Sequence, residues 1–249
     1  MNKKGSGMEF TGVEEIDELF DSPLLTIWAL FSFAAGIVLL ILSIAGGNFA
    51  QMAFFFFPLI FLLIIALKRP DWAEREDPNA VLSWTLLGLG GVLAIGAFFS
   101  FVAAAEGRYV WAPAEWTPMR LLQTIPGGEA KLPLLSVWFV DFFATGFLVA
   151  PGEQAFQASF FPLFNLEPLN WLDRLPFALN PPVFGGVGIW ALCHIIIGQY
   201  VTWYVIPVFL SGLVMAEAAY RSGTWFTSVL IHAINNWIAI MASMAMMGG

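Results

Sequence analysis

The chain contains two histidines, and both lie in apolar stretches long enough to cross a bilayer. His194 stands in GIWALCHIIIG and His232 in SVLIHAINNW, with Asn236 one helical turn after His232. Glu153, in VAPGEQAFQ, is a further polar residue within an apolar stretch. Ionisable side chains are costly in hydrocarbon and usually mark a functional site there. Together these residues indicate buried hydrolytic chemistry.

The residue types fit hydrolysis of an amide by a water molecule. A carboxylate in a low-dielectric site becomes a stronger base, so Glu153 can act as general base while His194 orients the attacking water. His232 and Asn236 share one helix face, where both can donate hydrogen bonds to a developing oxyanion. Two structural alternatives are also open. A buried histidine can simply pack against a carbonyl, and Glu153, two residues after Pro151, can cap a helix.

The elements that position these residues must be membrane helices. Of 249 residues, 59% are hydrophobic and 11% charged, against roughly 25% charged in soluble domains. The apolar period is helical rather than the alternation of an outer-membrane barrel. We therefore expect an all-α, polytopic transmembrane bundle with the lipid bilayer as a partner. The net charge of −8 argues against nucleic acid as a partner, and the single cysteine, Cys193, excludes an intrachain disulfide.

A helix needs about 20 apolar residues to cross a bilayer. Residues 1–22 form an acidic N-terminal segment, and residues 23–249 form the transmembrane domain. The domain contains about seven predicted spans, at 23–45, 50–67, 80–104, 134–165, 183–199, 201–219 and 224–246. Pro151 interrupts the long fourth span and predicts a kink or two helical pieces there.

The basic residues predict the orientation of the chain in the cell membrane. With seven spans and the N-terminus inside, the inside loops hold more lysine and arginine than the outside loops, which favours a cytoplasmic N-terminus. The inside set is Lys3, Lys4, Lys68, Arg69, Arg75, Arg174 and Arg221, and the outside set is Arg108, Arg120 and Lys131. At about 1.5 Å per residue, Glu153, His194 and His232 lie roughly 18, 16 and 12 Å from the inner boundary. The three are therefore expected at similar depth.

Three motifs follow one another in the C-terminal part of the chain. The first is APGE, ending at Glu153, and the second is WALCH, ending at His194. The third is an RSG turn followed by HAINN, which begins at His232. In order and spacing these motifs resemble those of the CAAX protease and bacteriocin-processing family, also called the Abi family. The likeness covers roughly residues 134–246.

The resemblance implies an intramembrane endopeptidase that acts on a peptide or membrane-protein substrate. Glu153 and His194 would then activate water, and His232 with Asn236 would stabilise the tetrahedral oxyanion. This mechanism needs no cofactor. The alternative is a metal-dependent protease in which Glu153, His194 and His232 form a three-ligand site.

The first motif departs from the family pattern Glu-Glu-x-x-x-Arg. Gln154 stands at the second glutamate and Ala158 at the arginine. Losing both partners of an ion pair leaves neither charge uncompensated, which is compatible with an intact site. We expect Gln154, Trp190 and Asp141 to support the site. The altered motif also favours a second function, a catalytically inactive relative acting as a membrane binding or immunity-type protein. A proton-coupled carrier is a third possibility.

Overall fold

The computed structural model describes residues 14–45, 49–68, 70, 76–105, 142–165, 175–198 and 205–247. All secondary-structure elements within these residues are helices, which confirms the all-α prediction. The long helices are α2 (Pro23–Ala45), α3 (Phe49–Leu67), α4 (Pro78–Ala105), α8 (Pro181–Gly198), α9 (Val205–Ser222) and α10 (Phe226–Met247). The short ones are α1 (Glu14–Leu19), η2 (Ala144–Val149), α7 (Ala150–Ala158), η3 (Phe161–Phe164) and η5 (Phe177–Leu179).

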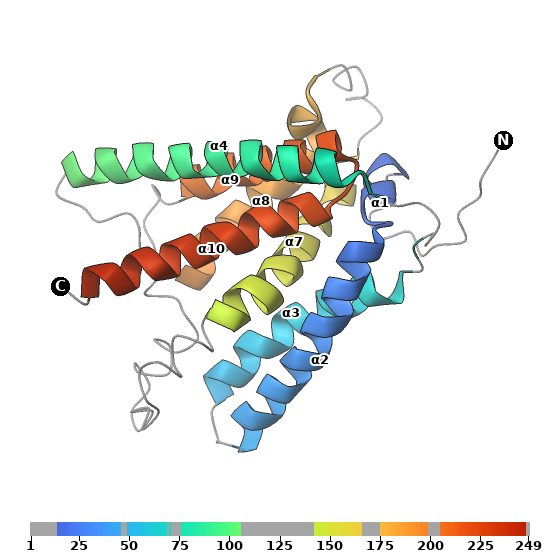
Figure 1. Cartoon of the computed structure of the whole chain (residues 1–249), viewed down its shortest axis with the longest axis vertical. Coiled ribbons are helices and arrows are strands. Elements are labelled where there is room, and N and C mark those ends of the chain that lie inside the picture. The colour runs from blue at the N-terminus through green and yellow to red at the C-terminus, as the bar shows by residue number, and fades with distance from the viewer. Residues whose placement is uncertain are drawn as a thin grey trace.

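The short helix α7 lies in the middle of the bundle (Figure 1). On one side, α2 packs beside α3, and on the other, α4 packs beside α9 and α10. Helix α8 packs against α9, and α7 itself contacts α3, α8 and α10. Side chains on different faces of α7 therefore meet α3, α8 and α10.

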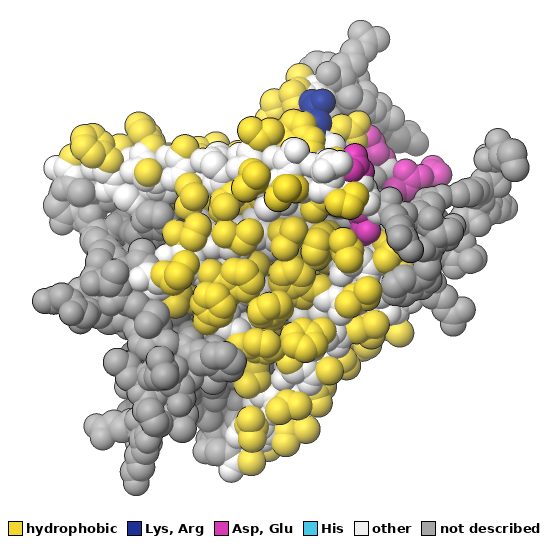
Figure 2. Space-filling model, viewed as in Figure 1, with side chains coloured by type: hydrophobic (Ala, Val, Ile, Leu, Met, Phe, Trp, Pro, Cys, Tyr) yellow, Lys and Arg dark blue, Asp and Glu magenta, His cyan; other side chains and the backbone are white. Residues whose placement is uncertain are grey.

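Three helices are long and apolar enough to cross a membrane, over Pro23–Leu42, Pro78–Val102 and Val205–Ser222. Shorter apolar helices cover Phe56–Leu67 and Phe226–Met241. Figure 2 shows a broad face of apolar side chains, with acidic side chains gathered at the end where α1 lies. An apolar outer face of this extent suits contact with lipid. The count of seven spans remains a prediction.

The fourth predicted span is not one regular helix. The chain passes from the π-helical η2 into α7, and Pro151 stands in the first turn of α7. Because proline has no N–H, the carbonyl of Phe147, four residues earlier, loses its α-helical donor. Trp28 Nε1 donates to this carbonyl at 3.2 Å, and the Ser32 hydroxyl donates to it as well. Hydrogen bonds from α2 thus satisfy the carbonyl that Pro151 leaves without a helical donor.

Part of the acidic N-terminal segment packs against the bundle. The Phe20 ring stacks on Trp225 with 5.0 Å between centroids. Lys68, at the end of α3, has 3% of its side chain exposed and lies 3.8 Å from the Asp17 carboxylate and 3.6 Å from that of Asp21. Its Nζ also donates to the Asp17 carbonyl at 2.9 Å. A buried lysine therefore joins the region of α1 to α3.

Candidate functional site

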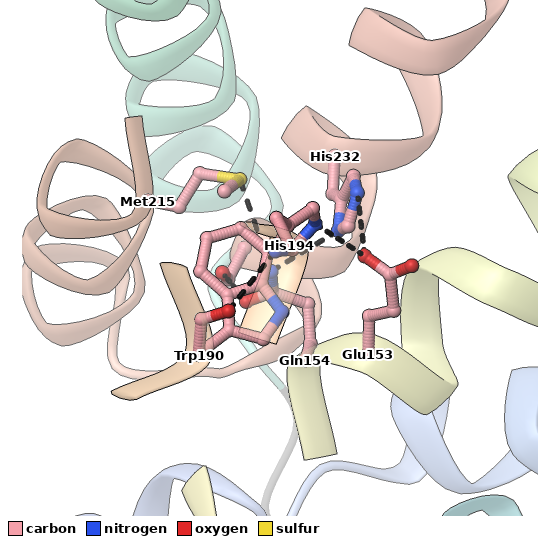
Figure 3. Close-up of polar contacts among 7 residues, drawn as sticks. Glu153, Gln154, Trp190, His194, Met215 and His232 are labelled. Carbon is pink, nitrogen blue, oxygen red and sulfur yellow. Dashed lines mark hydrogen bonds and ion pairs between the residues drawn. The ribbon is translucent and has the colours of Figure 1, made fainter. Parts of the chain in front are cut away.

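Glu153, His194 and His232 meet from three different helices (Figure 3). They belong to α7, α8 and α10 respectively. Glu153 Oε2 is 3.8 Å from His194 Nε2 and 3.6 Å from His232 Nε2. The side chains of Glu153 and His194 are 28% and 26% exposed, whereas that of His232 is 9% exposed. A partly accessible carboxylate oxygen therefore faces two imidazole nitrogens.

The position of Glu153 depends on close packing of α7 against α3. Gly152 lies so near Pro58 of α3 that a Cβ on it would be 2.5 Å from the Pro58 Cβ and 2.9 Å from its Cα. Only glycine allows this approach. Val149, just before α7, already has helical angles, φ −73° and ψ −47°. The helix thus continues from η2, and Glu153 points at the imidazoles rather than capping a free helix end (Figure 3).

The ring of His194 is oriented by its own helix. Its Nδ1 lies 3.0 Å from the carbonyl oxygen of Trp190, one turn earlier. A carbonyl can only accept, so Nδ1 carries the hydrogen, and in the neutral imidazole Nε2 presents a lone pair on the side of Glu153. The Trp190 indole packs edge-on against both imidazoles, with centroids 4.7 Å from His194 and 6.1 Å from His232. Trp190, expected to support the site, contacts both histidines.

Gln154 is fully buried and contacts His232 directly. Its Nε2 lies 3.1 Å from His232 Nδ1, and the Ser228 hydroxyl donates to its Oε1. The sulfur of Met215 lies 3.9 Å from the same Nε2. The position where the resemblance predicts a second glutamate thus holds a neutral amide against an imidazole.

The sequence did not single out Ser228 or Met215. Ser228 precedes His232 by four residues on α10, so the i, i+4 spacing is a signal that could have found it. Met215 comes from α9 and had no such signal. Asn236 lies one turn beyond His232 on α10 and is half-buried. Asp141, with the start of its predicted span, lies outside the described residues.

A metal site was the alternative for Glu153, His194 and His232. Within the described part of the chain, no group of three or more His, Cys, Asp or Glu side chains has the spacing of a metal site.

No protein-family model, no curated protein and no solved structure matches this chain. The resemblance to the CAAX/Abi family stays a prediction from the three motifs, whose residues Glu153, His194 and His232 lie close together in the structure.

Proposed function

We propose that the protein is an intramembrane endopeptidase of the CAAX/Abi type, which hydrolyses a peptide bond with water activated by Glu153 and His194. The observation that carries this proposal is the pair of acceptors 3.8 Å apart, Glu153 Oε2 and His194 Nε2. A single water oxygen about 2.8 Å from each can donate one hydrogen to each. Such a water has its own lone pairs free to attack a carbonyl carbon.

The proposed reaction needs no covalent enzyme intermediate. The water oxygen bonds to the peptide carbonyl carbon as Glu153 takes its proton. The carbonyl oxygen becomes an oxyanion that accepts hydrogen bonds from His232 and Asn236. Glu153 then returns the proton to the amide nitrogen as the C–N bond breaks, which releases a carboxylic acid and an amine.

The proposed setting is the cell membrane, with about seven spans and a cytoplasmic N-terminus. The support is the run of apolar helices and the excess of Lys and Arg on the predicted inner side. The substrate is a peptide or a membrane protein that reaches the exposed side of Glu153.

The test is cleavage by the purified protein reconstituted in liposomes with a mixture of prenylated peptides, leader peptides and single-span proteins. New termini are identified by mass spectrometry. Glu153→Gln, His194→Ala and His232→Ala should each abolish cleavage while the protein stays folded in detergent. Cys193→Ser is the matched control, because Cys193 neighbours His194 but points about 100° away from it around the helix. Full cleavage by Glu153→Gln would contradict the mechanism.

The role of a metal is tested in the same assay. Cleavage should continue in excess chelator, because Glu153 and His194 activate the water without a metal. Cleavage that stops with chelator and returns with Zn²⁺ would instead support the three-ligand alternative.

A second candidate function is supported by the first motif. Gln154 and Ala158 are neutral and fully buried where the family pattern has an acid and a base. An inactive relative that binds a membrane partner would keep the cluster of Glu153, His194 and His232 without hydrolysis. It predicts that the wild-type protein and Glu153→Gln capture the same membrane partner and that neither cleaves it.

A further inference from the structure

We infer that Gln154 holds His232 in the tautomer whose hydrogen is on Nε2, so that the two histidines of the chain carry their hydrogens on opposite ring nitrogens. Both tautomers follow from hydrogen bonds of the two rings, to the Gln154 amide and to the Trp190 carbonyl. Their consequence for catalysis rests on the proposed function, but the tautomers themselves do not.

The neighbours of the Gln154 amide decide which way it points. Its Oε1 accepts from the Ser228 hydroxyl. Its Nε2 lies 3.9 Å from Met215 Sδ, a thioether that has no hydrogen to donate. One end of the amide thus meets a donor and the other end meets a pure acceptor, which matches an oxygen toward Ser228 and an N–H toward Met215.

The same Nε2 lies 3.1 Å from His232 Nδ1 and donates to it. An imidazole nitrogen that accepts a hydrogen bond carries no hydrogen, so in the neutral ring the hydrogen is on Nε2. That Nε2 lies 3.6 Å from Glu153 Oε2. His232 therefore presents a donor to the centre of the site.

His194 presents an acceptor to the centre of the site, where His232 presents a donor. Its Nδ1 donates to the Trp190 carbonyl at 3.0 Å, so its Nε2 presents a lone pair 3.8 Å from the same Glu153 oxygen. One imidazole can accept a hydrogen from water, and the other can donate to an oxyanion. Backbone geometry fixes the first tautomer and Gln154 fixes the second, which makes Gln154 a positioning residue.

The amide of Gln154, which replaces a glutamate in the first motif, thus sets the tautomer of His232. A carboxylate at position 154 has no hydrogen to donate and would accept from His232 Nδ1–H. It would reverse the tautomer or hold the ring doubly protonated. The Nε2–H tautomer also leaves that nitrogen without the lone pair that a metal ligand needs.

The tautomers can be read directly, because the chain has two histidines. The full chain is produced with ¹⁵N-labelled histidine and a tag free of histidine, and the ring ¹⁵N shifts and couplings are measured in detergent at alkaline pH. His194→Gln leaves one imidazole and assigns the signals. We expect a protonated Nε2 and an unprotonated Nδ1 for His232, and the reverse for His194. An Nδ1–H ring at His232 in the wild type would overturn the inference.

Variants at position 154 then test whether Gln154 sets the tautomer of His232. In Gln154→Met the ¹⁵N shift of His232 Nδ1 should move from the value of an unprotonated nitrogen toward the average of two exchanging tautomers. In Gln154→Glu it should move to the value of a protonated nitrogen. Gln157→Met is the matched control, since Gln157 is also fully buried on α7 and its amide has no hydrogen-bond partner among the described residues. The control should keep the wild-type spectrum. An unchanged His232 spectrum in both Gln154 variants would also overturn the inference.

The spectra test the tautomer assignment, and the cleavage assay separately tests the proposed function. We expect Gln154→Glu to lower cleavage at least tenfold and Gln157→Met to leave it unchanged. If no variant or wild-type protein cleaves any peptide but the spectra are as expected, the proposed function fails and the tautomer assignment stands. If cleavage depends on Glu153 but His232 carries its hydrogen on Nδ1, the tautomer assignment fails and the proposed function stands.

Discussion

The amide of Asn236 shares a face of α10 with His232, because four residues make about one helical turn. We predict that Asn236→Ala lowers kcat about 10²–10³-fold, the usual effect of removing one oxyanion donor. KM should change little, because the oxyanion forms only on the way to the transition state. Steady-state cleavage in liposomes measures both constants. A raised KM at unchanged kcat would place Asn236 in substrate binding instead.

At the scale of single residues, the sequence was most informative where a side chain is out of place in hydrocarbon. Glu153, His194 and His232 could be chosen because ionisable groups in apolar runs are rare. Met215 could not be chosen, because methionine is ordinary in an apolar helix, and the one signal for Ser228 was its i, i+4 spacing from His232. Their contacts with Gln154 depend on which faces of α9 and α10 meet α7, and that is a property of the packed bundle.

At the scale of elements, the contact between α7 and α3 can be tested through one glycine. Gly152→Ala would place a Cβ 2.5 Å from the Pro58 Cβ and 2.9 Å from its Cα, so α7 must move away from α3. We predict a loss of about 1–3 kcal/mol in stability, as overpacking usually costs. Cleavage should fall as well, because Glu153 is the next residue. Thermal unfolding in detergent and the cleavage assay measure the two effects.

Gly90→Ala is the control for this substitution. Gly90 is exposed on α4, and a Cβ there would have nothing within 4 Å among the described atoms. The change should be neutral or stabilising by about 0.5–1 kcal/mol, because alanine favours a helix over glycine. If Gly152→Ala behaved like Gly90→Ala, the packing of α7 on α3 would not be what positions Glu153.

The boundaries of several elements followed from the sequence. The predicted spans 23–45, 50–67 and 80–104 agree with α2, α3 and α4 to within two residues, because Pro, Gly and charged residues flank long apolar runs. The passage from η2 to α7 was predictable only as a break at Pro151. The hydrogen bonds that satisfy the Phe147 carbonyl come from Trp28 and Ser32. These residues are more than a hundred positions away, so the sequence around Pro151 does not predict them.

At the scale of the whole molecule, Lys68 makes stability depend on pH. Burial lowers the pKa of the Lys68 ammonium below its usual 10.5, although the Asp21 and Asp17 carboxylates oppose the shift. The folded protein then binds fewer protons than the unfolded chain between the lowered pKa and 10.5, so stability rises as pH rises through that window. We predict that the difference in unfolding temperature between the wild type and Lys68→Met moves in favour of the wild type as pH approaches 10.5.

Unfolding is followed in detergent at a series of pH values. The comparison with Lys68→Met removes the titration of the other groups, which are common to both proteins. A difference that stays constant up to pH 10.5, or that moves against the wild type, would show that burial does not lower the pKa of Lys68 in solution.

The all-α architecture was predictable from composition and period, but the pairing of helices was not. In a membrane protein both the packed face and the lipid face of a helix are apolar, so hydropathy does not tell them apart. Leu62 and Leu63 of α3 illustrate this, because the first is fully buried and the second is 41% exposed. The same ambiguity explains why the sequence predicts a similar depth for Glu153 and the histidines but does not predict that they meet.

The hydrogen bonds to the Phe147 carbonyl have a consequence for how the protein is made. Trp28 and Ser32 belong to α2, which is synthesised more than a hundred residues before Phe147. Chains fold from the N-terminus during synthesis, so α2 has already been made when the proline-interrupted segment arrives. That segment carries a carbonyl that Pro151 leaves without a helical donor, and α2 supplies the donors. The N-terminal helix α2 is thus in place before the segment around Phe147, which leads into the helix that carries Glu153, packs against it.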